Sequence, residues 1–378
     1  MHEKSALPPF LILTVGTGTA GKSSNLIQGL INTLHQAKPR RFWLVPSTAP
    51  DSIEVANLVR EGAPDAGAFQ PWAATNPYRC IVAPDDIFDC RFAVREVISI
   101  ARRDLREGEQ LIVNPTSGTK QMSAGATLAA LDEGIGEIVF TVGERADGVV
   151  KTGTERLAPF STATFFLERD LRNADELFRS GSFFGAARLL QGYTQADALR
   201  AREIAWCLHE WQRLNYNRAA SHAAKFSQDL REHLKRLDQT DGWSFERLGD
   251  LLASADELIR WGDFEEALAR FYRATELLAR RRLKEIGREQ HESRWGKLWE
   301  ELRSQKDPLA QAFFLDRPLR ESLQDRNDTV FGHGSKSVSE TLVRDVRVGL
   351  ARLLQDHLPK EVMPFWKVPP RPQTLRSA

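Results

Sequence analysis

The chain has few cysteines and almost no net charge. Cys80, Cys90 and Cys207 are too few and too widely spaced for a disulfide framework or a paired metal-binding motif. The formal net charge over 378 residues is +1, so no overall basic field favours nucleic acid, and a site for a polyanion has to be a local patch. These absences predict reduced thiols in a cytoplasmic protein that carries no metal.

Long apolar runs are missing as well. No stretch reaches the roughly 18 apolar residues that a membrane-spanning helix needs. Residues 1–9 lack the pattern of a secretory signal peptide. We therefore expect no membrane association. A chain of 378 residues is too long for one ordinary core, so two domains joined by a helical segment are expected.

The first half of the chain alternates short apolar runs with amphipathic segments. The apolar runs are nearly continuous and rich in β-branched residues, as in parallel strands that are covered on both faces. They are Phe10–Val15, Phe42–Val45, Cys80–Ala83, Leu111–Val113 and Ile138–Val142. Helices are expected near residues 20–36, 51–60, 91–106 and 117–133, and a closing hairpin at 148–159. The alternation predicts a doubly wound α/β domain, Rossmann-like with a parallel sheet core, over residues 1–165.

The second half has a different texture, because strand-like runs disappear. Stretches rich in Ala, Leu, Glu and Arg show the apolar spacing of three and four that is typical of helices. These are Leu171–Leu190, Ala196–Leu214, Phe245–Trp261, Phe264–Ile286 and Thr341–Leu358, with Asp263 as an expected N-cap. We predict a helical connector over 166–245, an all-helical domain over 246–360, and a loose tail rich in Pro and Arg over 361–378.

A glycine-rich loop follows the first apolar run, with the sequence Gly-Thr-Gly-Thr-Ala-Gly-Lys-Ser. Glycines let a ligand approach the backbone, and free N–H groups at a helix start attract phosphate. The candidate ligand-binding residues are Thr17, Gly18, Thr19, Lys22 and Ser23. The string also fits the P-loop of ATPases, which additionally needs a strand-end Asp for magnesium; Asp85 is the nearest candidate. A glycine-rich turn without a ligand is the third interpretation.

A second polar loop, Asn-Pro-Thr-Ser-Gly-Thr-Lys-Gln-Met, follows the fourth run and precedes another expected helix. Its candidate residues are Asn114, Thr116, Ser117, Gly118, Thr119, Lys120 and Met122. Because the carboxyl ends of parallel strands meet at one edge of a sheet, both loops are expected to line one crevice that binds nucleotide phosphates and bases. The alternative is plain helix capping by Thr116 or Ser117, with Lys120 in solvent.

The helical half contains one segment with chemistry suited to RNA. Cleavage without a metal needs a group that titrates near neutrality and a cation that stabilises the charged phosphorane, and His333 and Arg326 supply these. Positions seven apart lie on the same face of a helix, so the two side chains are expected to converge, with Gly332 and Gly334 ending that helix. A purely structural role is the alternative.

The two loops resemble those of the CARF domain of CRISPR-associated proteins, over residues 8–160. The segment from Arg326 to His333, together with Asp263–Glu276 upstream, resembles the HEPN ribonuclease domain over residues 250–358. The order CARF then HEPN is similar to that of the accessory ribonucleases of type III CRISPR systems. The resemblance implies a homodimer that binds cyclic oligoadenylate in front and cleaves single-stranded RNA behind, without a metal, in antiviral defence.

The resemblance also implies residue roles. His333 acts in acid–base transfer at the RNA 2′-hydroxyl or the leaving oxygen, Arg326 stabilises the scissile phosphate, and Asn327 supports that geometry, with Glu276 and Arg273 in weaker supporting roles. The site is composite, with one set from each protomer, and no cofactor is implied besides the activator. Ring size and cleavage of the activator by the front domain stay open. The alternatives are a P-loop ATPase with a helical effector domain and a non-catalytic cyclic-nucleotide sensor or adaptor.

Overall fold

The computed structural model describes residues 7–18, 23–63, 82–146, 149–288, 294–325, 329, 335–358 and 371–375. The chain divides into two compact units, Met1–Glu168 and Arg169–Ala378, with the boundary inside helix α5 (Ala163–Arg179). Of the helices that it describes, none is both long and apolar enough to cross a membrane.

The front unit is built on a five-stranded sheet with the order β2-β1-β3-β4-β7. Its strands are β1 (Phe10–Val15), β2 (Arg41–Pro46), β3 (Leu111–Asn114), β4 (Glu137–Val142) and β7 (Arg156–Ser161). The pairings β1–β2, β1–β3 and β3–β4 are parallel, and β7 runs antiparallel to β4 at the edge. The predicted α/β fold with a parallel sheet core is confirmed. In place of the hairpin expected at 148–159, β7 pairs with β4, and β5 (Arg145–Ala146) pairs with β6 (Val149–Val150).

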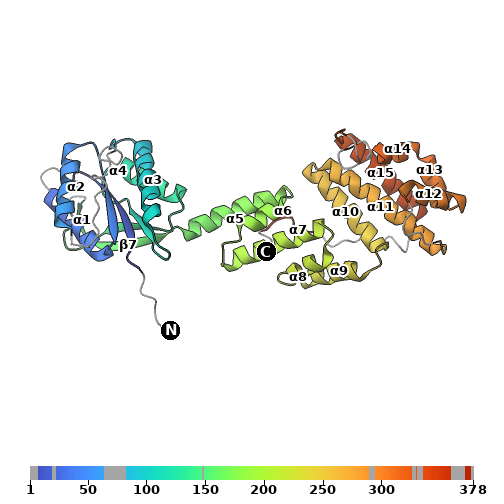
Figure 1. The fold of residues 1–378 in the computed structure, drawn as a ribbon, viewed down its shortest axis with the longest axis horizontal. Coiled ribbons are helices and arrows are strands. Elements are labelled where there is room, and N and C mark those ends of the chain that lie inside the picture. Colours follow the sequence, from blue (N-terminus) through green and yellow to red (C-terminus); the bar gives the residue numbers. More distant parts are fainter. Residues whose placement is uncertain are drawn as a thin grey trace. The chain divides into compact units, whose positions relative to one another are not determined.

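Helices cover both faces of this sheet (Figure 1). Helices α1 (Ser23–Ala37) and α2 (Pro50–Gly62) share one apolar cluster with the sheet, and α3 (Ile87–Asp104) and α4 (Lys120–Asp132) share the other. The apolar run of β1 is continuous because both of its faces are buried. Leu11 and Leu13 belong to the first cluster, and Phe10 and Ile12 belong to the second. A strand with apolar neighbours on both faces has no polar face.

The strand predicted at Cys80–Ala83 is not formed as expected in the residues that can be described. Val82 makes only an isolated parallel bridge with Ser47, while Cys80 lies outside the described residues. Pro84 lacks a backbone N–H and so cannot donate to a neighbouring strand. Asp86 follows as the N-cap of α3, and its side chain accepts hydrogen bonds from the backbone of that helix.

In the described part of the back unit, every named element is a helix. Four of the predicted helices are confirmed to within a few residues: α7 (Ala196–Gln212), α10 (Phe245–Trp261), α11 (Phe264–Glu285) and α15 (Glu340–His357). Asp263 caps α11 as predicted, accepting a hydrogen bond from the Glu266 backbone. Shorter helices that the sequence pattern did not reveal are α8 (Tyr216–Ala223), α9 (Gln228–Gln239), α12 (Trp295–Ser304), α13 (Pro308–Leu315) and α14 (Arg317–Gln324).

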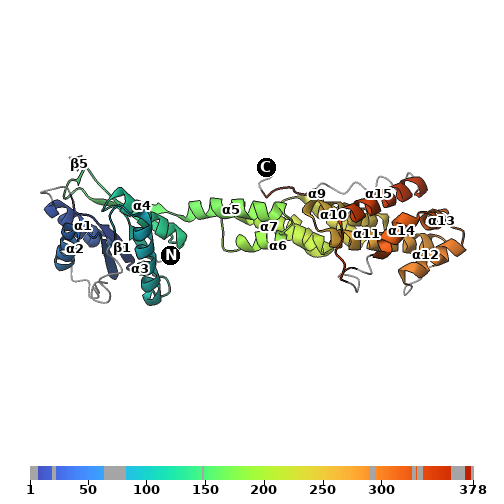
Figure 2. The same cartoon turned by 90° about the horizontal axis from the view of Figure 1, so that it is seen from above.

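The helix predicted at Leu171–Leu190 is two helices, α5 and α6 (Phe183–Leu189). Gly181 separates them with a left-handed φ of +81°, and a Cβ there would lie 2.9 Å from the Trp261 ring. A glycine at this position therefore both ends α5 and admits the tryptophan. Helices α5, α6 and α7 lie side by side (Figures 1 and 2).

Two apolar cores stabilise the back unit. One gathers side chains from α5 through α9, with Trp211 fully buried, and the other gathers side chains from α10 through α15, with Phe271 and Phe313 fully buried.

The predicted loose tail is wrong for Arg371–Leu375. The Arg371 side chain is 3% exposed and pairs with Glu257 at 2.7 Å and Asp250 at 3.4 Å. The backbone N–H of Leu375 donates to the Asp175 carboxylate at 2.8 Å, and the Leu375 side chain enters the core around α7. The composition of the tail is that of a solvated segment, but α10 buries two carboxylates that need a cation, and Arg371 provides it.

Candidate functional site

The two polar loops touch each other at the carboxyl edge of the sheet. A Cβ on Gly16 would lie 2.8 Å from the backbone of Gly118, so the loops approach more closely than any larger residue allows. The backbone N–H of Gly16 donates to Ser117 Oγ at 3.0 Å, and Thr14 Oγ1 donates to the Ser117 carbonyl. These contacts hold the first loop against the second. The loops can meet because they follow the neighbouring parallel strands β1 and β3.

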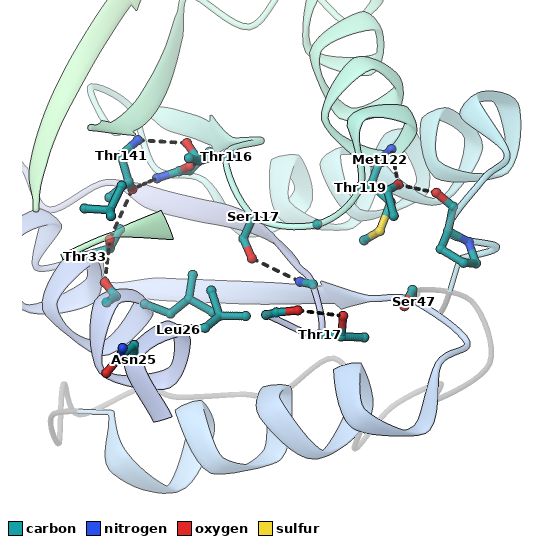
Figure 3. A pocket seen from close by; sticks show the side chains of 18 of the residues that line it. Thr17, Asn25, Leu26, Thr33, Ser47, Thr116, Ser117, Thr119, Met122 and Thr141 are labelled. Atoms are coloured by element: carbon teal, nitrogen blue, oxygen red, sulfur yellow. Dashed lines mark hydrogen bonds between the residues drawn. The ribbon is translucent and has the colours of Figure 1, made fainter. Parts of the chain in front are cut away.

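A cavity of about 600 Å³ lies beside these loops (Figure 3). Its volume falls in the range of small-molecule sites, and strand ends are where open α/β sheets bind ligands. The predicted residues that line it are Thr17, Gly18, Asn114, Thr116, Ser117, Gly118, Thr119 and Met122. Ser23 and Lys120 are exposed and do not line it, and Thr19 and Lys22 lie outside the described residues.

A chain of hydrogen bonds fixes the second loop to the sheet and to α1. The Asn114 amide donates to Thr141 Oγ1 at 2.9 Å, and that oxygen lies 3.2 Å from Thr33 Oγ1. The backbone N–H of Thr141 donates to Thr116 Oγ1 at 2.8 Å, and the N–H of Thr116 donates to Asn114 Oδ1 at 3.1 Å. Because Asn114 is 3% exposed, these bonds satisfy a buried amide and hold the cavity wall in one arrangement.

The wall next to α4 is rich in hydrogen-bond donors. Thr119 caps this helix by accepting from the Met122 N–H at 3.2 Å, so neither Thr116 nor Ser117 is the cap. The Thr116 and Ser117 hydroxyls accept backbone hydrogen bonds, and their own protons have no acceptor within the described part of the chain. Together with the positive end of the α4 dipole, they favour an anionic group such as phosphate.

The opposite wall comes from residues that the motifs did not reveal. Helix α1 contributes Asn25, Leu26, Gly29, Leu30 and Thr33, and Glu155 precedes β7. The residues of α1 recur at helical spacing, and a glycine and a threonine interrupt its apolar stripe, which is a signal that one face of a helix meets something other than core. Glu155 stands in a polar turn-like run and has no comparable signal.

The magnesium-binding groups of a P-loop are not gathered at this cavity in the described residues. Asp85 lines it, but the Ser23 hydroxyl, which would bind the metal, is exposed on α1 and does not.

The predicted catalytic residues Arg326, Asn327 and His333 lie outside the described residues. Of the described residues next to them, helix α14 ends at Gln324, and Thr329 forms an isolated parallel bridge with Lys336.

Glu276, a candidate for a supporting role, is engaged in ion pairs on α11. Its carboxylate lies 2.6 Å from Arg273 and 3.0 Å from Arg280. Burial alone would raise the pKa of Glu276, but the hydrogen bonds and charges of these two arginines lower it below its ordinary value. The carboxylate is therefore ionised near neutrality and holds Arg273 and Arg280 in place.

Comparisons with known proteins agree with this architecture. Residues 243–317 match the family model of the Csm6 HEPN domain, a match that ends before Arg326. The solved structure of Enterococcus italicus Csm6 bound to cyclic hexa-2′-fluoro-hexa-dAMP is similar over 95% of this chain and 97% of that chain, with a TM-score of 0.61 and 8% sequence identity. No curated protein sequence matches significantly. The fold is that of a Csm6, which confirms the predicted resemblance to CARF–HEPN proteins.

Proposed function

We propose that this protein is an endoribonuclease of type III CRISPR antiviral defence, which cyclic oligoadenylate activates. One observation carries the proposal: the loops of β1 and β3 meet at a cavity lined by hydroxyls and backbone N–H groups, in a chain with the fold of a Csm6. The match of residues 243–317 to the Csm6 HEPN domain supports the ribonuclease half.

The front unit binds the activator through neutral donors. The described lining contains no Lys or Arg, so the phosphates of the ring are received by Ser117, Thr116, the N-terminus of α4 and the backbone around Gly118. Such donors, fixed in advance by the Asn114 network, bind phosphate without the conformational cost of ordering long basic side chains. A ring-shaped ligand fits a two-fold axis, so we propose that the protein is a homodimer.

The back unit cleaves single-stranded RNA by transfer within the substrate. The 2′-oxygen attacks the adjacent phosphorus, the bond to the 5′-oxygen breaks, and the products are a 2′,3′-cyclic phosphate and a 5′-hydroxyl. His333 moves the proton at the attacking or the leaving oxygen, Arg326 stabilises the phosphorane, and Asn327 supports Arg326. No metal is needed for this step. Both protomers contribute to the catalytic site. Binding of the ring to the front unit therefore shifts the dimer between two states, and the ligand-bound state has the assembled site in the back unit.

The test uses the full-length protein and a fluorogenic single-stranded RNA in EDTA, with and without cyclic tetra- or hexa-adenylate. We expect cleavage with one of the rings and none without it. His333→Ala should abolish cleavage, and His357→Ala, a change at the end of α15, is the matched control and should cleave normally.

Each failure points to a different function. No cleavage with either ring overturns the proposal. Equal RNA decay in wild type and His333→Ala identifies a sensor or adaptor instead, and magnesium-dependent ATP hydrolysis that is lost in Lys22→Ala identifies a P-loop ATPase.

A further inference from the structure

One carboxylate on the cavity wall is buried without a cation. Glu155 is 8% exposed and lines the cavity, and no Lys or Arg pairs with it among the residues described. Its Oε2 atom accepts from the Asn32 amide at 3.2 Å and from the Gly153 N–H at 2.7 Å. Its Oε1 atom has no hydrogen-bond donor in the described part of the chain. A carboxylate oxygen that has no donor from the protein and belongs to a cavity-lining residue can accept a hydrogen bond from a ligand in that cavity.

The free oxygen lies beside Gly29, another cavity-lining residue. A Cβ built on Gly29 would be 3.1 Å from Glu155 Oε1, so the glycine leaves room at this oxygen. The apolar side chains of Leu26, Leu30 and Val150 line the same cavity. The cavity lining therefore combines apolar side chains with a carboxylate oxygen that can accept a hydrogen bond.

The charge of Glu155 decides which part of a ligand reaches it. A carboxylate repels phosphate, and phosphate is better placed at the hydroxyls and N–H groups of Thr116 and Ser117. The group at Glu155 has to donate a hydrogen bond and carry no negative charge, and the apolar side chains that line the same cavity suit a nucleobase.

We propose that Glu155 Oε1 accepts a hydrogen bond from the 6-amino group of an adenine of the bound ring and so favours adenine over hypoxanthine and guanine at this cavity. This inference rests on the proposed function. Only one carboxylate oxygen is free, because Asn32 and Gly153 occupy the other. The site thus matches the single exocyclic amino group of adenine, whereas the two adjacent donors on the edge of guanine call for both oxygens.

The decisive variant is Glu155→Gln, because the structure fixes how the new amide is oriented. The N–H groups of Asn32 and Gly153 require an acceptor at the position of Oε2, so the glutamine oxygen occupies it and the NH₂ group points to the base. A donor then faces the ligand where the wild type has an acceptor. That donor repels the amino group of adenine and attracts the 6-oxo group of hypoxanthine.

The experiment measures binding of full-length protein by calorimetry to cyclic oligoadenylate, in whichever of the tetra- or hexa-ring sizes binds more tightly, and to the cyclic oligoinosinate of the same size. Wild type should prefer the adenylate ring by about 10-fold or more, the range of one hydrogen bond to a charged group. Glu155→Gln should reverse the preference. Glu144→Gln, an exposed carboxylate paired with Lys151, is the matched control and should keep the wild-type ratio.

The outcomes separate the inference from the proposed function. If wild type binds neither ring, the proposed function fails. If it binds the adenylate ring but Glu155→Gln keeps the wild-type ratio, the function stands and the role of Glu155 is wrong. Should Glu155→Gln not fold, Gly29→Ala decides, because its methyl group displaces Oε1 by a few tenths of an ångström. Gly29→Ala must then lower the adenine preference; an unchanged preference refutes the inference.

Discussion

The buried ion pairs of Arg371 make a sharp prediction about the stability of the back unit. Arg371 lies 2.7 Å from Glu257 and 3.4 Å from Asp250, and its guanidinium carbon is 4.2 Å from the centre of the Trp211 ring. Arg371→Met keeps apolar contact with Trp211 and removes the charge. Glu257 and Asp250 then remain buried without this cation, and breaking a buried pair in this way costs about 3–5 kcal/mol.

The lower end of that range applies here. Asp250 keeps hydrogen bonds from Trp211 Nε1 at 2.8 Å and the Tyr216 hydroxyl at 2.9 Å, and Glu257 keeps Arg260 at 3.6 Å. We therefore expect a loss of about 3 kcal/mol in the free energy of unfolding, which lowers the melting temperature by about 6–12 °C for a unit of this size. Urea unfolding followed by far-UV circular dichroism measures it.

The control is Arg317→Met, which removes an ion pair whose side chains are 76% and 52% exposed. A surface pair of this kind contributes less than about 1 kcal/mol. If Arg371→Met destabilises the protein no more than Arg317→Met does, Arg371 does not offset the buried carboxylates and the reasoning is refuted.

The pH dependence gives a second check on Arg371→Met. Burial raises the pKa of Glu257 above its ordinary value of 4.5 although Arg371 opposes this, and removal of the cation raises the pKa further. The folded variant therefore keeps a proton that the unfolded chain loses, so its stability falls as pH rises from about 4.5 through the raised pKa. The deficit relative to wild type should be smaller at about pH 5 than at about pH 8; an equal deficit at both contradicts the mechanism.

Two further changes test the loops of the front unit. Gly16→Ala places a Cβ 2.8 Å from the backbone of Gly118, so the loops must separate; binding of the cyclic oligoadenylate should weaken by at least about 10-fold in calorimetry, and unchanged binding would show that their contact is dispensable. Thr119→Ala removes the cap of α4 and should cost about 1 kcal/mol in urea unfolding, whereas Thr127→Ala, inside the same helix, should cost less.

The sequence predicted most elements because their signals are local. The apolar run Phe10–Val15 has no polar face, and the structure places apolar side chains on both sides of β1. The ends of helices and the short helices were harder to predict. Gly181 separates α5 from α6 by a single left-handed residue, and the short helices α8, α9 and α12–α14 carry too few turns for a periodic pattern to stand out.

The candidate site also has one part that the sequence predicts and another part that it does not. Its loops were predictable from Gly16–Gly18 and Asn114–Thr119, since these motifs follow strands whose parallel order brings their ends together. Glu155 was not, because its burial depends on Asn32 and Gly29, more than a hundred residues earlier in the chain. Arg371 is the same case, since Asp250 and Glu257 decide that it is buried. A residue type describes what a side chain can do, but only contacts distant in sequence decide whether a charge is solvated or enclosed. The predictions for Glu155 and Arg371 therefore depend on charges that the fold encloses, Glu155 at the cavity and Arg371 beside Trp211, Asp250 and Glu257 in the back unit.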